Sequence, residues 1–122
     1  MNIKHLHLHV KNRSESEQFY EAWLGLRIAR RGKVITFMTD DSGFDLALMD
    51  DPAPGSMPQW FHFGTRVESS DAVSTLHQEM RQAAVPIAKP LFQDETMSSF
   101  RCVDPDGYAI EVYWEAESAP LD

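Results

Sequence analysis

The chain has 122 residues, 43% of them hydrophobic and 25% charged, which is the composition of a single globular domain, residues 1–122, with a real core. Its formal net charge of −8 argues against a nucleic-acid partner and against a membrane surface, and no apolar run is long enough to span a bilayer. The single cysteine, Cys102, excludes an internal disulfide, and the opening MNIKHLHL lacks the pattern of a signal peptide. We therefore expect a cytoplasmic protein.

The first half of the chain predicts a strand, a helix and three further strands. HLHLHV, residues 5–10, alternates histidine with aliphatic residues as a half-buried strand does. The helix that follows has Ser14 and Glu17 at capping-box spacing, and its apolar positions recur at Phe19, Trp23 and Leu26. A strand is expected around residues 27–30, and two β-rich runs flank the turn DDSG within residues 34–49.

The second half repeats this order. HFGTRV, residues 62–67, opens it, and Ser70 is the expected N-cap of a helix whose apolar stripe is Val73, Leu76, Met80 and Ala84, with Pro86 ending it. A less clear strand covers residues 87–91, and two β-rich runs flank DPDG within residues 99–114. The boundaries are module one at 1–50, a Pro- and Gly-rich linker at 51–58, module two at 59–116 and an acidic tail at 117–122.

Two βαβββ modules of this length, with GL after the first helix and DPDG before the last strand, resemble the vicinal oxygen chelate superfamily. That superfamily contains glyoxalase I, extradiol dioxygenases, fosfomycin-resistance proteins and bleomycin-binding proteins. The resemblance covers nearly the whole chain and implies an α+β fold in which the two modules form a cup-shaped mixed sheet. It also implies a homodimer, but it leaves open whether the modules pair within one chain or are swapped between chains. Fold alone does not assign a function.

Aligning the two halves brings candidate metal ligands to equivalent positions. When the modules are aligned on Val10 and Val67, His5 falls opposite His62; when they are aligned on the glycines of DDSG and DPDG, Glu111 falls opposite Ala47. If the modules pack as a pseudo-two-fold pair, His5, His62 and Glu111 converge. Two imidazoles and a carboxylate suit one divalent ion, Fe²⁺, Mn²⁺, Ni²⁺ or Zn²⁺, and leave positions open for a substrate. The competing interpretation is three ordinary polar positions on strand faces.

The resemblance implies the same three ligands, because His5, His62 and Glu111 stand at the positions of the metal ligands in metal-dependent members. Glyoxalase I-like members have a fourth ligand where this chain has Ala47, and whether Asp45 contributes instead stays open. His7, on the face of His5, is either an acid/base group or a hydrogen-bonded wall residue. His77 is expected at the surface of the second helix.

Three further residues are candidates for binding the substrate. Ser99 and Arg101 share one face of a strand, and by the resemblance the Arg101 position faces the metal, where related enzymes usually have Tyr. Arg101 is thus a catalytic or substrate-binding candidate that binds a carboxylate or phosphate, unless it points outward to a surface acid. Tyr113 shares a face with Glu111 and is expected to line the cup.

These features predict a divalent-metal-dependent enzyme of the glyoxalase/dioxygenase type with a small oxygen-rich substrate. For each named reaction, one residue of the family's pattern is missing. The catalytic histidine of the dioxygenases has no counterpart in QDETMSS, and His7 stands where the thiol-transferase branch has a hydroxyl residue. The fourth metal ligand of glyoxalase I is also absent. Isomerase or lyase, dioxygenase and thiol-transferase chemistry therefore remain open. The alternative is a metal-free binding protein of the bleomycin-resistance type, which the acidic charge would suit.

Overall fold

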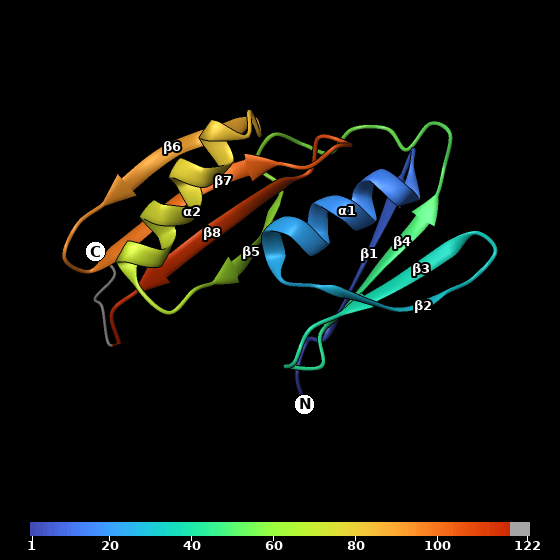
Figure 1. Ribbon diagram of the computed structural model, residues 1–122, viewed down its shortest axis with the longest axis horizontal. Helices are drawn as coiled ribbons and strands as arrows, with labels where there is room; N and C mark the ends of the chain where they lie inside the picture. The colour runs from blue at the N-terminus through green and yellow to red at the C-terminus, as the bar shows by residue number, and fades with distance from the viewer. Residues whose placement is uncertain (118–122) are drawn as a thin grey trace. The chain divides into compact units, whose positions relative to one another are not determined.

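The structure is a computed structural model that describes residues 1–117, so residues 118–122 of the predicted acidic tail lie outside the described residues. Its contacts divide the chain into two compact units, Met1–Ser56 and Met57–Asp122, and the boundary falls within the predicted linker. Each unit is built from one helix and one four-stranded sheet (Figure 1). Over the described range, no helix has the length and apolar character of a membrane span.

The first unit runs strand, helix, strand, strand, strand, as expected. Its elements are β1 (His5–Val10), α1 (Arg13–Leu24), β2 (Arg27–Arg31), β3 (Ile35–Thr39) and β4 (Asp45–Asp50). The strand order is β1-β4-β3-β2; β1 and β4 are parallel, and the other neighbours are antiparallel.

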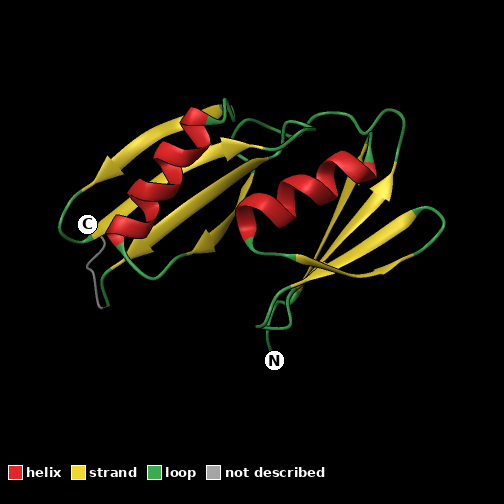
Figure 2. Cartoon of the chain, in the orientation of Figure 1, coloured by secondary structure: helices red, strands yellow, loops and turns green. Residues whose placement is uncertain are grey.

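The second unit has the same plan (Figure 2). Its elements are β5 (His62–Arg66), α2 (Ser70–Gln82), β6 (Ile87–Gln93), β7 (Met97–Val103) and β8 (Ala109–Glu115). The strand order is β5-β8-β7-β6, with β5 and β8 parallel. Two four-stranded mixed sheets with two helices confirm the α+β class and the duplicated βαβββ plan.

The two acidic turns have the same construction. The side chain of Asp40 accepts hydrogen bonds from the backbone N–H groups of Ser42 and Phe44, and Asp104 accepts from those of Asp106 and Tyr108. The glycine that closes each turn, Gly43 or Gly107, has a positive φ (85° and 92°), which glycine adopts without a Cβ clash. The turns therefore set the last two strands of both units in the same register.

One face of each sheet packs against its helix and is apolar. In the second unit, this face supplies fully buried side chains that pack with Val73 and Met80 of α2, namely Phe100, Cys102, Ile110 and Val112. In the first unit, the corresponding residues are Leu8, Val10, Met38, Leu46 and Leu48. Because strand side chains alternate, the polar candidates of each unit lie on the opposite face of its sheet.

The predicted capping box at the start of α1 is wrong. Asn12 is the N-cap, and its side chain accepts the backbone N–H of Glu15 at 3.1 Å. Glu17 instead accepts hydrogen bonds from Thr36 and Arg31, because its turn of the helix faces the sheet. The helix ends at Gly25, whose left-handed conformation (φ 67°) is a common helix C-terminus.

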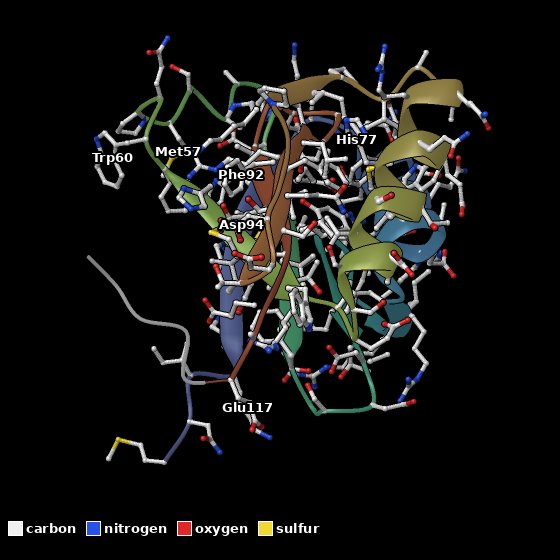
Figure 3. The ribbon with its side chains drawn as sticks, turned by 90° about the vertical axis from the view of Figure 1, so that its left-hand side faces the viewer. Met57, Trp60, His77, Phe92, Asp94 and Glu117 are labelled. Atoms are coloured by element: carbon white, nitrogen blue, oxygen red, sulfur yellow. The ribbon has the colours of Figure 1, made fainter. Side chains whose placement is uncertain are left out.

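The details of α2 also differ from the sequence interpretation. Ser69, not Ser70, is the N-cap, and the helix ends at Gln82, so Ala84 lies beyond it in a positive-φ turn. His77 is not a plain surface residue. Its ring lies 5.0 Å from that of Phe100, edge to face, on the helix side of the sheet (Figure 3). Burial and the nearby Arg81 lower the pKa of His77.

Candidate metal centre

His62 and Glu111 are brought together by the parallel pairing of β5 and β8. Gly64 is in register with Glu111, and His62 precedes Gly64 by two positions, so both side chains leave the same face. The Nε2 atom of His62 lies 3.9 Å from Oε2 of Glu111. The two side chains are 30% and 25% exposed, so the pair is accessible to a small ligand.

The backbone orients the ring of His62. Its Nδ1 atom lies 3.0 Å from the carbonyl oxygen of Trp60, which can only accept a hydrogen bond. Nδ1 therefore carries the proton in the neutral ring, and the lone pair of Nε2 faces Glu111. A histidine that donates its second ring N–H to a carbonyl is the usual arrangement of a metal ligand.

The spacing of the pair fits a single metal ion. Protein nitrogen and oxygen ligands lie about 2.1 Å from a divalent ion such as Zn²⁺, so two such donors can be at most about 4.2 Å apart. The observed separation of 3.9 Å lies within that limit. Within residues 1–117, no group of three or more His, Cys, Asp or Glu side chains forms a ready metal site. The pair thus needs a further donor to complete a three-residue site.

Arg101 lies beside Glu111 on the neighbouring strand. The two residues are direct partners in the β7–β8 pairing, and Nε of Arg101 is 3.7 Å from Oε1 of Glu111. Arg101 thus lies on the same sheet face as the His62–Glu111 pair, and the acid with which it pairs is Glu111. The two oxygen atoms of Glu111 therefore face different groups, an imidazole and a guanidinium.

Tyr113 and Ser99 are direct partners in the same pairing, so they share the face of Glu111. The ring of Tyr113 lies across Gly64: a Cβ added to Gly64 would be 3.3 Å from the Tyr113 Cε1 atom. The sequence interpretation missed this role of Gly64, although a glycine inside a strand is a known sign of close approach. Ser99 is buried, so it offers less surface to a ligand than its neighbours.

His5, His7 and His9 lie on one face of β1 in the first unit. The ring centroids of His5 and His7 are 6.4 Å apart, and those of His7 and His9 are 5.1 Å apart. His9 Nδ1 lies 2.9 Å from a carboxylate oxygen of Asp51. His5 and His7 are exposed, and His5 is in register with Asp45, which is also exposed.

The strand registers make the same residues equivalent as the sequence alignment did. In the first unit His7 is in register with Ala47, and in the second Gly64 is in register with Glu111. His5 and His62 each precede the paired residue by two positions. His5 therefore occupies in its unit the position that His62 occupies in the other, and Ala47 occupies that of Glu111.

Comparisons with known proteins agree with this architecture. A model of the Glyoxalase/Bleomycin resistance protein/Dioxygenase superfamily matches residues 2–112. A structure described as a possible glyoxalase from Bacillus cereus has 31% sequence identity and a TM-score of 0.80, over 92% of this chain and 97% of that one. The fosfomycin resistance protein FosX from Listeria monocytogenes has 15% identity and a TM-score of 0.80, over 96% and 95%, which supports the fold alone.

A search of the curated proteins found no match for this sequence. The superfamily match covers far more than half of the chain, and the duplicated βαβββ plan and the Bacillus cereus structure agree with it. This protein therefore belongs to the glyoxalase/bleomycin resistance protein/dioxygenase superfamily.

Proposed function

We propose that this protein is a divalent-metal-dependent enzyme that acts on a small oxygen-rich substrate with an anionic group. The observation that carries the proposal is the His62–Glu111 pair. Its donor atoms are 3.9 Å apart, the histidine tautomer is set by the carbonyl of Trp60, and both side chains are partly exposed. A structural role would not require a lone pair directed at a carboxylate in this way.

The metal ligands we propose are His62, Glu111 and His5. His5 belongs to the first module, and it comes either from the same chain or from a second chain. Superfamily members commonly use a divalent metal, and this donor set suits Fe²⁺, Mn²⁺, Ni²⁺ or Zn²⁺. When bound, such an ion would act as a Lewis acid that polarises substrate oxygen atoms. The protein supplies three donors, which leaves coordination positions for those oxygen atoms.

The remaining candidates orient the substrate and move protons. Arg101 binds the anionic group through its guanidinium, which has several donors in a fixed geometry. Tyr113 places a hydroxyl group on the same face, and Ser99 supports it from the neighbouring strand. His7 is the proposed proton carrier, because it is the exposed imidazole next to His5 on β1.

Metal content tests the proposal directly. The untagged protein, purified and incubated with each of the four ions, should retain about one ion per chain by elemental analysis, as a three-ligand site predicts. His62→Ala, Glu111→Ala and His5→Ala should each lose it. His77→Asn is the matched control, because His77 lies on the helix side of the sheet. Absence of metal in the native protein, or full retention in His62→Ala, would reject the proposed site.

We further propose a homodimer, for which sedimentation equilibrium is the direct measurement. Mixing His5→Ala with His62→Ala chains then distinguishes the two module pairings. If each site takes His5 from one chain and His62 from the other, random mixing restores about one quarter of the sites, because half of the dimers are mixed and each has one intact site. If each site forms within one chain, mixing restores none.

One observation favours a second candidate function, a metal-free binding protein of the bleomycin-resistance type. Trp60 is 74% exposed beside β5, and Met57 and Phe92 are also large exposed apolar side chains of this unit (Figure 3). An acidic protein with exposed aromatic residues could bind a cationic drug. Titration of tryptophan fluorescence with bleomycin in the presence of EDTA tests this: a saturable change that His62→Ala leaves unaltered would favour the binding protein over the enzyme.

A further inference from the structure

The carboxylate of Glu111 is shared between two groups. Its Oε2 atom faces Nε2 of His62 at 3.9 Å, and its Oε1 atom faces Nε of Arg101 at 3.7 Å. We propose that Arg101 couples the two ligands of the site: a dianionic oxyanion group of the substrate, bound by Arg101, increases the affinity of the His62–Glu111 pair for its metal ion. This inference rests on the proposed function, and it names the substrate class and how the anion and the metal ion affect each other's binding at that site.

The side chain of Arg101 is placed to receive an anion. It is 23% exposed, and its Nε atom is buried without a hydrogen-bond partner in the described part of the chain. At 3.7 Å, the contact with Glu111 is an ion pair and not a hydrogen bond. A guanidinium has five N–H donors, so Arg101 can bind an oxyanion while it remains beside Glu111.

A second positive charge lies next to Arg101. Lys89 of β6 is its direct partner in the β6–β7 pairing, and directly paired residues leave the same face of a sheet. Lys89 is exposed, so its ammonium group can move toward a ligand. Two adjacent cations in a chain with a net charge of −8 favour a group with two negative charges, such as a phosphate, a phosphonate or a sulfate, over a single carboxylate.

The coupling follows from the position of the positive charge. The guanidinium that is paired with Glu111 opposes a divalent cation at the same carboxylate, because like charges repel most strongly where water is partly excluded. An oxyanion bound to Arg101 compensates the charge and removes the opposition. Linkage then requires reciprocity, so the metal ion must strengthen binding of the anion by the same factor.

The experiment measures Mn²⁺ affinity by the paramagnetic resonance signal of free Mn²⁺, in sulfate and in chloride at equal ionic strength. We expect sulfate to strengthen Mn²⁺ binding about tenfold, which is within the usual range of coupling between sites. Arg101→Gln should bind Mn²⁺ more tightly than the native protein in chloride and should show no sulfate effect. Lys89→Gln should show a reduced effect, and Arg101→Lys, which keeps the charge, should retain part of it.

The possible results separate the inference from the proposed function. A sulfate effect that persists in Arg101→Gln would mean that the anion binds the metal directly, and it would overturn the inference. Tight Mn²⁺ binding by the native protein without any sulfate effect would overturn the inference alone. No Mn²⁺ binding in either salt would overturn the inference, whereas the proposed metal site would be rejected only if the protein also retains none of the other three ions. Circular dichroism checks that each variant is folded. If Arg101→Gln does not fold, Arg101→Lys tests the inference instead, because it should show a smaller sulfate effect than the native protein.

Discussion

Glu17 is a buried carboxylate that holds α1 against the sheet of the first unit. Its side chain is only 6% exposed, and it accepts hydrogen bonds from the Thr36 hydroxyl at 2.6 Å and from Nη2 of Arg31 at 2.9 Å. The hydrogen bond from Arg31 lowers the pKa of Glu17 against the opposing effect of burial, and the bond from Thr36 lowers it further. Glu17 is therefore ionised in the folded protein at neutral pH, and the charge is part of the packing.

We predict that Glu17→Gln lowers the free energy of unfolding by about 2 kcal/mol at pH 7, within the range for a hydrogen bond to a charged group. The amide keeps an acceptor for buried Thr36 but loses the charge that Arg31 pairs with. The side chain of Arg31 is 60% exposed and regains water, so the loss stays below the 3–5 kcal/mol typical of breaking a fully buried ion pair. Glu17→Ala also removes the acceptor of Thr36, and we expect it to cost about 1–3 kcal/mol more.

The pH dependence gives this prediction a second test. The folded-state pKa of Glu17 lies below its unfolded value, so its contribution is fully present above the unfolded pKa of about 4.5 and is lost as the pH falls through the folded pKa. The native protein should therefore lose stability in acid more steeply than Glu17→Gln, and the difference between them should shrink below about pH 4.5.

Urea unfolding at several pH values, followed by circular dichroism and by tryptophan fluorescence, measures this difference. Glu21→Gln is the control, because Glu21 is an exposed carboxylate one turn further along the same helix. We expect it to change stability by less than about 0.5 kcal/mol. A difference between the native protein and Glu17→Gln that stays constant from pH 7 to pH 3, or that is as small as the control, would contradict this account of the buried charge.

Three other predictions concern the helix start, the thiol and the metal pair. Asn12→Ala should destabilise the protein by about 1 kcal/mol through loss of the N-cap, whereas Ser14→Ala should change stability by less than about 0.5 kcal/mol; urea unfolding compares the two. Burial raises the pKa of Cys102 to about 11, so a disulfide reagent at pH 8 should label it only after denaturation. Metal held at the proposed His62–Glu111 pair should be released on acidification, as followed by equilibrium dialysis, because a protonated imidazole cannot bind a metal.

Strand alternation and turn chemistry made most of the fold predictable. The alternation in residues 5–10 and 99–103 placed His5 and Arg101 on the opposite face from the core, and the structure agrees. The acidic turns closed by Gly43 and Gly107 marked the last two strands of each unit. These patterns are local in the sequence, so they can be recognised without knowledge of tertiary contacts.

Tertiary contacts explain what the sequence did not predict. Ser14 and Glu17 have capping-box spacing, but the carboxylate of Glu17 accepts hydrogen bonds from Arg31 of β2 and Thr36 of β3 instead. His77 lies on the polar side of its helix by periodicity, yet its ring contacts that of Phe100 of β7. The tautomer of His62 depends on where the carbonyl of Trp60 points, which no residue pattern encodes.

The chemistry of the site follows from how the two modules differ at equivalent positions. His5 and His62 are the same residue type, so the duplication itself supplies two imidazoles. At the Ala47 position of the first module the second module has a carboxylate, Glu111, whereas the exposed carboxylate of the first module, Asp45, lies two residues earlier. Gly64 stands in place of His7, and its lack of a side chain lets the ring of Tyr113 lie across β5 beside Glu111.

Arg101 then places a positive charge beside Glu111. In the first module, Phe37 of β3 is in register with Ala47, so the equivalent position carries no charge. The second module has the imidazole of His62 with a carboxylate, a guanidinium and a phenol on one sheet face, whereas in the first module the Arg30 guanidinium lies over the Phe37 ring. For the proposed site, we therefore expect substitutions at Arg101 and Tyr113 to alter substrate preference, and substitutions at His62 and Glu111 to alter metal retention.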